Sequence, residues 1–187
     1  MVVKLLASVA VTGLLLSTTV GPTRAVAQGA GLETDSSFIQ MAGSLALLQV
    51  KLGKLAQENG SSSAVRDFGK RMVADYSKTT EELAAGAKQA AYPSPVLMRQ
   101  HKQLVDRFSH MGRSSFDKNY MTETVNAHNE AVRLFQHEAE SGRVASLKQM
   151  ATSLLPTVKE HLELARETAG VVGADLTAAT TAERQGS

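Results

Sequence analysis

Apolar residues recur along most of this chain at steps of three and four, the spacing that places them on one face of a helix. Four long segments show this pattern, and the helices predicted from them cover residues 36–58, 63–90, 115–140 and 144–169. A shorter helix is predicted over residues 96–109. Alternation of apolar and polar residues never persists for five positions, so the pattern predicts no strand.

The predicted helices are separated by residues that start or end helices. Asp35 or Ser36 is the expected N-cap of the first helix. The segment NGSSS at 59–63 separates the first two helices. The prolines of AYPSP at 91–95 stop the second helix, because proline lacks a backbone N–H and restricts the residue before it. Gly142 is suited to end the fourth helix.

Four long helices and one short helix predict an all-α bundle. The connection between the second and fourth helices, residues 91–114, contains the short helix and can cover about 20 Å at ~1.5 Å per residue. This length favours two helical hairpins joined by a long crossover, the ferritin-like four-helix arrangement, over simple up-and-down order. An irregular five-helix bundle is the alternative. Pro156 lies within the last predicted helix and is expected to bend it.

The first residues of the chain have the pattern of a secretory signal peptide. Lys4 precedes an apolar run, and the small residues Ala25 and Ala27 stand at the two positions that a signal peptidase reads. Residues 1–27 are therefore predicted to be a signal peptide that is cleaved before Gln28. A membrane anchor is the alternative, but the apolar run is shorter than the ~20 residues that span a bilayer. The protein is expected to be periplasmic or extracellular.

The rest of the chain is predicted to be one helical domain, residues 36–169, between a flexible segment at 28–35 and a mobile tail at 170–187. Two of the 20 basic residues lie in the leader, so the mature chain has as many basic residues as its 18 acidic ones. This balance excludes a nucleic-acid-binding protein. The chain has no cysteine, so its core stabilises it without disulfides, and no thiolate can bind a metal. No membrane span is expected in the mature chain.

Each long predicted helix carries one polar residue on its apolar face. These residues are Gln49, Tyr76, His128 and His161, and Asp75 lies beside Tyr76. At ~1.5 Å per residue, all four fall in the middle third of the bundle, where they are expected to form one polar layer. A hydrogen-bonded layer is the first interpretation, because buried polar groups need partners. A divalent metal site made by Asp75, His128 and His161 is the second, and a catalytic role is the third.

The motifs of well-known catalytic sites are missing from the sequence. There is no Glu-x-x-His pair for a di-iron site, no His-Glu-x-x-His zinc motif, no phosphate-binding loop and no Gly-x-Ser-x-Gly. The remaining histidines, His101, His110 and His137, are predicted to lie on solvated helix faces. No catalytic or cofactor-binding residue is therefore predicted, and an enzyme is not favoured.

Three segments resemble a known family. They are GKLAQENGSSSAVRDFGKRMVADYS, FDKNYMTETVNAHNEAVRLFQHEAESG and LLPTVKEHLELA, and they resemble the bacterial exported family called domain of unknown function 4142. The resemblance covers residues 36–168 and implies a ferritin-like four-helix bundle. Members of that family usually have Asp-His where this chain has Asp75-Tyr76, Asp-His in place of Ala127-His128, and a Glu in place of Gln49. His161 is kept.

These departures remove one imidazole and two carboxylates from the layer that the resemblance implies. They favour a closed polar core, or a degenerate site, over a working metal centre. The expected function is that of a non-enzymatic, exported bundle of the cell envelope, with an interaction or stress-related role and an envelope or protein partner. The alternative is a ferritin-like metal-binding or oxidoreductase protein, and a surface-binding or adhesion module is a third.

Overall fold

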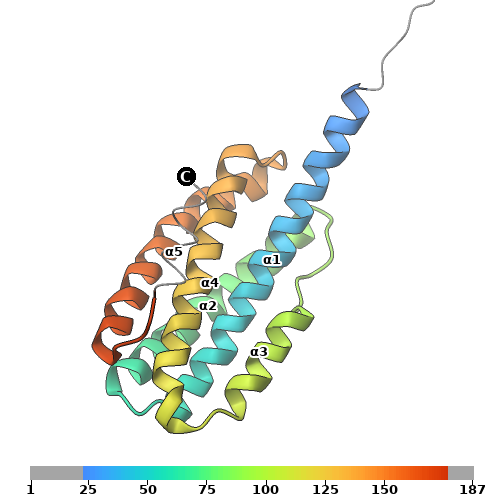
Figure 1. Ribbon diagram of the computed structural model, residues 1–187. Coiled ribbons are helices and arrows are strands. Elements are labelled where there is room, and N and C mark those ends of the chain that lie inside the picture. The colour runs from blue at the N-terminus through green and yellow to red at the C-terminus, as the bar shows by residue number, and fades with distance from the viewer. Residues whose placement is uncertain (1–22, 177–187) are drawn as a thin grey trace, which may run out of the picture.

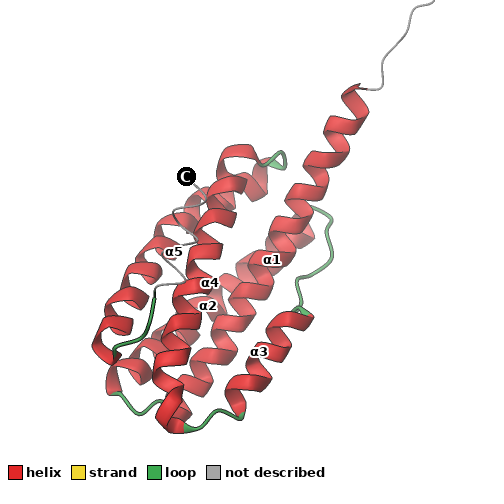
Figure 2. Ribbon diagram, viewed as in Figure 1, coloured by secondary structure: helices red, strands yellow, loops and turns green. Residues whose placement is uncertain are grey.

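The protein is an all-helical bundle, as predicted. The computed structural model describes residues 23–176, and side-chain surroundings from residue 35 onward. The predicted signal peptide therefore lies mostly outside the described residues, as does the end of the predicted tail. The helices are α1 (Thr23–Asn59), α2 (Ser63–Gln89), α3 (Arg99–Ser109), α4 (Arg113–Ser141) and α5 (Ala145–Val172). No strand occurs among the described residues (Figure 2).

The long helices form two hairpins, α1 with α2 and α4 with α5, which pack through α1 against α4 and through α2 against α5 (Figure 1). Asp117, near the start of α4, accepts hydrogen bonds from the backbone N–H groups of Ser61 and Ser62, which lie in the turn between α1 and α2. The second hairpin therefore starts at the end of the bundle where the first one turns. The connection over residues 90–112 returns the chain to that end, and its helix α3 packs on α1.

Three helix boundaries differ from the sequence prediction by three residues or more. Helix α1 begins at Thr23, so residues 28–35 are helical rather than a flexible segment, and this part of α1 projects beyond the other helices in Figure 1. Helix α3 begins at Arg99 because Met98, as N-cap, is still extended. Helix α5 continues through Pro156 to Val172, past the predicted end.

The start of the predicted mobile tail is also structured. Gly173 ends α5 in the left-handed conformation, with φ of 64° and ψ of 42°. Glycine adopts this conformation without the steric cost that a side chain adds. Ala174 and Leu176 then pack against the core, and the carbonyl of Asp175 accepts a hydrogen bond from Thr122.

The core is built from aliphatic side chains and from aromatic pairs that join the helices. Phe38 of α1 meets Phe135 of α4 edge to face at 5.2 Å between ring centroids, and Phe68 of α2 meets Tyr120 of α4 at 6.1 Å. Such pairs add attraction to the burial of apolar area. They link the two hairpins on either side of the polar layer described below.

Helices α1 and α2 pack closely against each other at two glycines. A Cβ atom added to Gly69 would lie 2.7 Å from the carbonyl oxygen of Gly53, and one added to Gly53 would lie 2.8 Å from the carbonyl oxygen of Gly69. Both distances are shorter than a van der Waals contact. The first hairpin therefore depends on the absence of side chains at this crossing.

Candidate functional site

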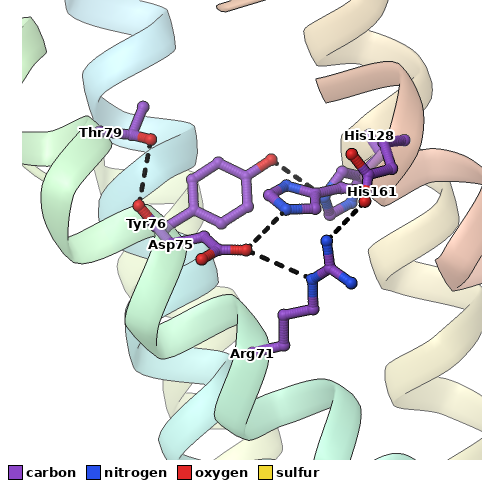
Figure 3. Close-up of polar contacts among 7 residues, drawn as sticks. Arg71, Asp75, Tyr76, Thr79, His128 and His161 are labelled. Carbon is purple, nitrogen blue, oxygen red and sulfur yellow. Dashed lines mark hydrogen bonds and ion pairs between the residues drawn. The ribbon is translucent and has the colours of Figure 1, made fainter. Parts of the chain in front are cut away.

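Three rings from three helices meet at the centre of the bundle. They belong to Tyr76 of α2, His128 of α4 and His161 of α5 (Figure 3). The Tyr76 ring centroid is 5.7 Å from that of His128 and 5.2 Å from that of His161, and the two imidazoles are 6.0 Å apart. All three side chains are buried, with 6%, 1% and 2% of their surfaces exposed. The structure therefore brings together three residues of the predicted polar layer.

Both ring nitrogens of His128 have hydrogen-bond partners. Its Nδ1 lies 2.8 Å from the carbonyl oxygen of Thr124, one helical turn earlier. A carbonyl only accepts, so Nδ1 carries the proton and Nε2 is left as an acceptor. The hydroxyl of Tyr76 lies 3.0 Å from Nε2 and donates to it. This arrangement holds the imidazole in one tautomer and one orientation.

His161 is held from the other side by Asp75. Its Nε2 donates to the carboxylate Oδ2 at 3.0 Å. The carboxylate is about one-third exposed and lies beside Arg71, whose Nε is 3.4 Å from Oδ2. Arg71 also donates to Glu160 at 2.6 Å, which ties α2 to α5 at the surface (Figure 3). The other imidazole nitrogen of His161, Nδ1, is buried and has no partner among the described residues.

Burial keeps this layer electrically neutral near pH 7. It lowers the pKa of His128 to about 4, although the Thr124 carbonyl acts in the opposite direction. Burial also lowers the pKa of His161, against the effect of the Asp75 carboxylate. The pKa of the Tyr76 phenol is raised by burial and by the negative charge of Asp75. For both histidines, the desolvation of the charged form outweighs the partners that would raise the pKa.

Gln49 of α1 borders a small cavity beside the rings. Its side chain is 2% exposed, and its Oε1 has no hydrogen-bond partner in the part of the chain that the structure describes. The volume within which the centre of a water molecule can lie is about 10 Å³. Tyr76 and His128 also line this cavity. That volume is about the size needed for a single water. An organic substrate does not fit in it.

The candidate metal ligands do not converge on one point. Asp75 contacts His161, whereas His128 is joined to Tyr76 rather than to Asp75. No group of three or more His, Cys, Asp or Glu side chains within residues 35–176 is arranged to hold a metal ion. The arrangement gives hydrogen bonds between pairs of these side chains and no open coordination sphere among the described residues. The same described helices include none that is long and apolar enough to span a membrane.

A comparison with models of protein families gives a match over most of the chain. The model of the family described as domain of unknown function, DUF4142, matches residues 20–168. The chain belongs to the DUF4142 family. All four residues of the polar layer and Asp75 lie within the DUF4142 match. No curated protein and no solved structure matches the chain.

The prediction that His101 lies on a solvated face is wrong. His101 of α3 is 6% exposed, and its Nδ1 lies 2.6 Å from Oγ of Ser44, which is fully buried on α1. The same oxygen accepts the backbone N–H of Met98 at 2.8 Å. Ser44 therefore fastens the start of α3 to α1. The signal was in the sequence, because His101 stands three and four positions before Leu104 and Val105 on the apolar face of α3.

The burial of two acidic side chains was also not predicted from the sequence. Asp35 was expected to cap the first helix, and Glu138 lies in the last turn of α4. Both are fully buried where α1 meets the turn between α4 and α5. Acidic residues are almost never buried without a partner, so sequence reasoning places them at the surface. By contrast, His110 and His137 are exposed, as predicted.

Proposed function

We propose that this protein is an exported, non-enzymatic helical bundle of the bacterial cell envelope that acts through its surface, in an interaction or stress-related role. In this proposal the polar layer stabilises the bundle and fixes the register of its helices. A polar layer can do this because a helix shifted along its neighbours would leave buried polar groups without partners.

The hydrogen bonds made by the two histidines are the observation on which the proposal rests. His128 has a partner on each ring nitrogen, and Nε2 of His161 is held by Asp75. A metal ion that bound to Nε2 of both histidines would have to displace the hydroxyl of Tyr76 from His128 and the carboxylate of Asp75 from His161. Hydrogen bonds that already satisfy these nitrogens support a structural role for the layer.

Metal binding is the first test of this proposal. Purified mature protein is analysed for bound elements, and its melting temperature is measured with and without added Fe, Cu, Zn or Mn. We expect no stoichiometric metal and no shift in melting temperature, because ligand binding to the native state alone would raise it. Stoichiometric metal, together with a shift that His161→Ala abolishes, would refute the structural role of the layer.

Export is supported by the basic and apolar start of the chain and by Ala25 and Ala27 before the predicted cleavage position. The test is to fractionate cells that express the full chain and to determine the N-terminal residue of the product. We expect a product that begins at Gln28 in the periplasm or the medium. A cytoplasmic product that keeps Met1 would contradict export and would leave the role of the polar layer unaffected.

Metal binding or oxidoreductase activity of the ferritin-like type is the second candidate function. It is favoured by two buried acceptors that lack partners among the described residues, Nδ1 of His161 and Oε1 of Gln49. Unpaired buried acceptors are costly, and a bound cation is one way to satisfy them. The elemental analysis described above distinguishes the two candidates.

A further inference from the structure

A pair of buried carboxyl groups lies at the end of the bundle remote from the turn between α1 and α2. Asp35 of α1 and Glu138 of α4 are both fully buried. They lie where α1 passes the turn that joins α4 to α5, seen near the top of Figure 1. Two carboxylates side by side in a dry site repel each other, so one of them holds its proton more tightly than usual.

Asp35 is the member of the pair that is stabilised as an anion. Its Oδ1 accepts the backbone N–H of Arg143 at 3.0 Å, and its Oδ2 accepts that of Val144, also at 3.0 Å. Val144 is the N-cap residue of α5, and it supplies no side-chain cap of its own. Asp35 therefore caps α5 from a different helix, where a negative charge is favourable. These two hydrogen bonds fasten the α4–α5 turn to α1.

Glu138 has the opposite surroundings. Both oxygens of its carboxyl group are buried, and apart from the Asp35 carboxyl beside it no side chain in residues 35–176 gives them a hydrogen-bond partner. The group folds over the turn, because a Cβ atom at Gly142 would lie 2.5 Å from its Oε1. Glu138 also stands in the last turn of α4, where the helix dipole disfavours a negative charge. The site therefore favours the neutral acid.

The groups that face Glu138 come from three other parts of the chain. Asp35 faces it from α1, Lys148 from α5, and Tyr92 from the connection after α2. Burial and the charge of Asp35 raise the pKa of Glu138 to about 7, whereas the Lys148 ammonium acts in the opposite direction. Lys148 donates to the carbonyl of Glu140 at 2.9 Å and forms no ion pair with Glu138.

We propose that Glu138 and Asp35 form a proton-operated latch, which holds the α4–α5 turn on α1 while Glu138 carries a proton and loosens it when Glu138 ionises. The step releases one proton from the Glu138 carboxyl to water and leaves two carboxylates facing each other. Asp35 lies inside α1, whereas Glu138 stands in the last turn of α4, so Glu138 is the group that moves out to solvent. The end of α4 and the turn after it move with Glu138.

The test combines the titration of Glu138 with hydrogen exchange of the turn. Carbon-13 NMR of the full chain follows the Glu138 carboxyl carbon, and exchange rates of the Arg143 and Val144 amides are measured from about pH 5 to about pH 8. After correction for the intrinsic rate, we expect protection of these amides to fall by up to about tenfold for each pH unit as pH rises toward the pKa of Glu138, about 7, and to level off above it.

Matched variants assign the effect to this one group. Glu138→Gln keeps the shape of the side chain without a titrating proton, and we expect it to make protection of the two amides independent of pH. Glu140→Gln is the control, because Glu140 is exposed one half-turn further along the same helix. We expect Glu140→Gln to leave the pH dependence of wild-type protein unchanged.

Three results would overturn the latch. One is titration of the Glu138 carboxyl at its ordinary pKa of 4.5 in wild-type protein, a measurement that needs no variant to fold. Another is the same pH dependence of protection in wild-type protein and in Glu138→Gln. The third is recovery of protection at about pH 8 on adding Ca²⁺ or Mg²⁺, which would show that the carboxyl pair responds to a cation.

Discussion

Tyr76 shows how a single residue changes the character of a bundle core. Its phenol fills space between two imidazoles and still donates a hydrogen bond to His128. An imidazole in its place would add a second nitrogen that needs a partner, whereas the phenol ring is apolar apart from one hydroxyl. The layer therefore keeps aromatic packing and a single chain of hydrogen bonds from Tyr76 to the carbonyl of Thr124.

Replacement of Tyr76 by Phe tests the hydrogen bond to His128. The change removes the donor and leaves Nε2 of His128 buried without a partner, so we expect unfolding free energy to fall by about 1–3 kcal/mol. Tyr120→Phe is a matched control, because the Tyr120 hydroxyl is also fully buried but has no hydrogen bond of ordinary geometry within the described residues. Urea denaturation measures both variants. An equal loss for the two would show that the Tyr76 bond adds nothing.

At the scale of the helices, their number, order and approximate ends follow from the spacing of apolar residues and from Pro and Gly. The errors in placing single polar residues occur where the residue bonds to a partner far away in the sequence. Asp35 resembles an N-cap of α1 in the sequence but caps α5 in the structure. Ser44 and His101 resemble ordinary polar positions, yet they join α1 to α3. Local patterns do not reveal such pairs, because the partners are far apart in sequence.

The close crossing of α1 and α2 gives a prediction at this scale. Gly69→Ala would place a Cβ atom 2.7 Å from the Gly53 carbonyl oxygen, so the helices must separate. We expect a loss of about 1–3 kcal/mol in unfolding free energy, measured by thermal or urea denaturation. Gly170→Ala in α5 is the control, since no atom lies within 4 Å of its Cβ position. We expect that change to be stabilising, by up to about 1 kcal/mol. Similar effects at both sites would rule out the close crossing.

For the whole molecule, two buried sites give opposite responses to acid. The pKa of His128 is lowered from 6.5 to about 4, so the folded protein binds fewer protons than the unfolded chain between these values. Stability is therefore lost as pH falls through that window, and His161 acts in the same direction. The pKa of Glu138 is raised from 4.5 to about 7, so this carboxyl adds stability as pH falls from 7 to 4.5.

These two responses can be separated by measuring stability against pH. In wild-type protein they partly cancel between about pH 6.5 and pH 4.5. The variant Glu138→Gln removes the response of the carboxyl and keeps that of the buried histidines. We therefore expect its unfolding free energy to drop by about 3 kcal/mol as pH falls from 6.5 to 4. Urea denaturation at a series of pH values gives the curve, with Glu140→Gln as control. A curve for Glu138→Gln no steeper than that of wild-type protein would contradict this account.

The sequence alone determined the all-helical class, the two hairpins with a helix in the connection, and the presence of a polar residue in the middle of each long apolar face. These features follow from local spacing, because a helix places every third and fourth residue on one side. Only the tertiary structure decided that Tyr76 bonds His128 while Asp75 bonds His161, and that Asp35 and Glu138 are buried together. Such pairings depend on how helices rotate and slide against each other to within a few ångströms, and the periodicity of a single helix does not specify that.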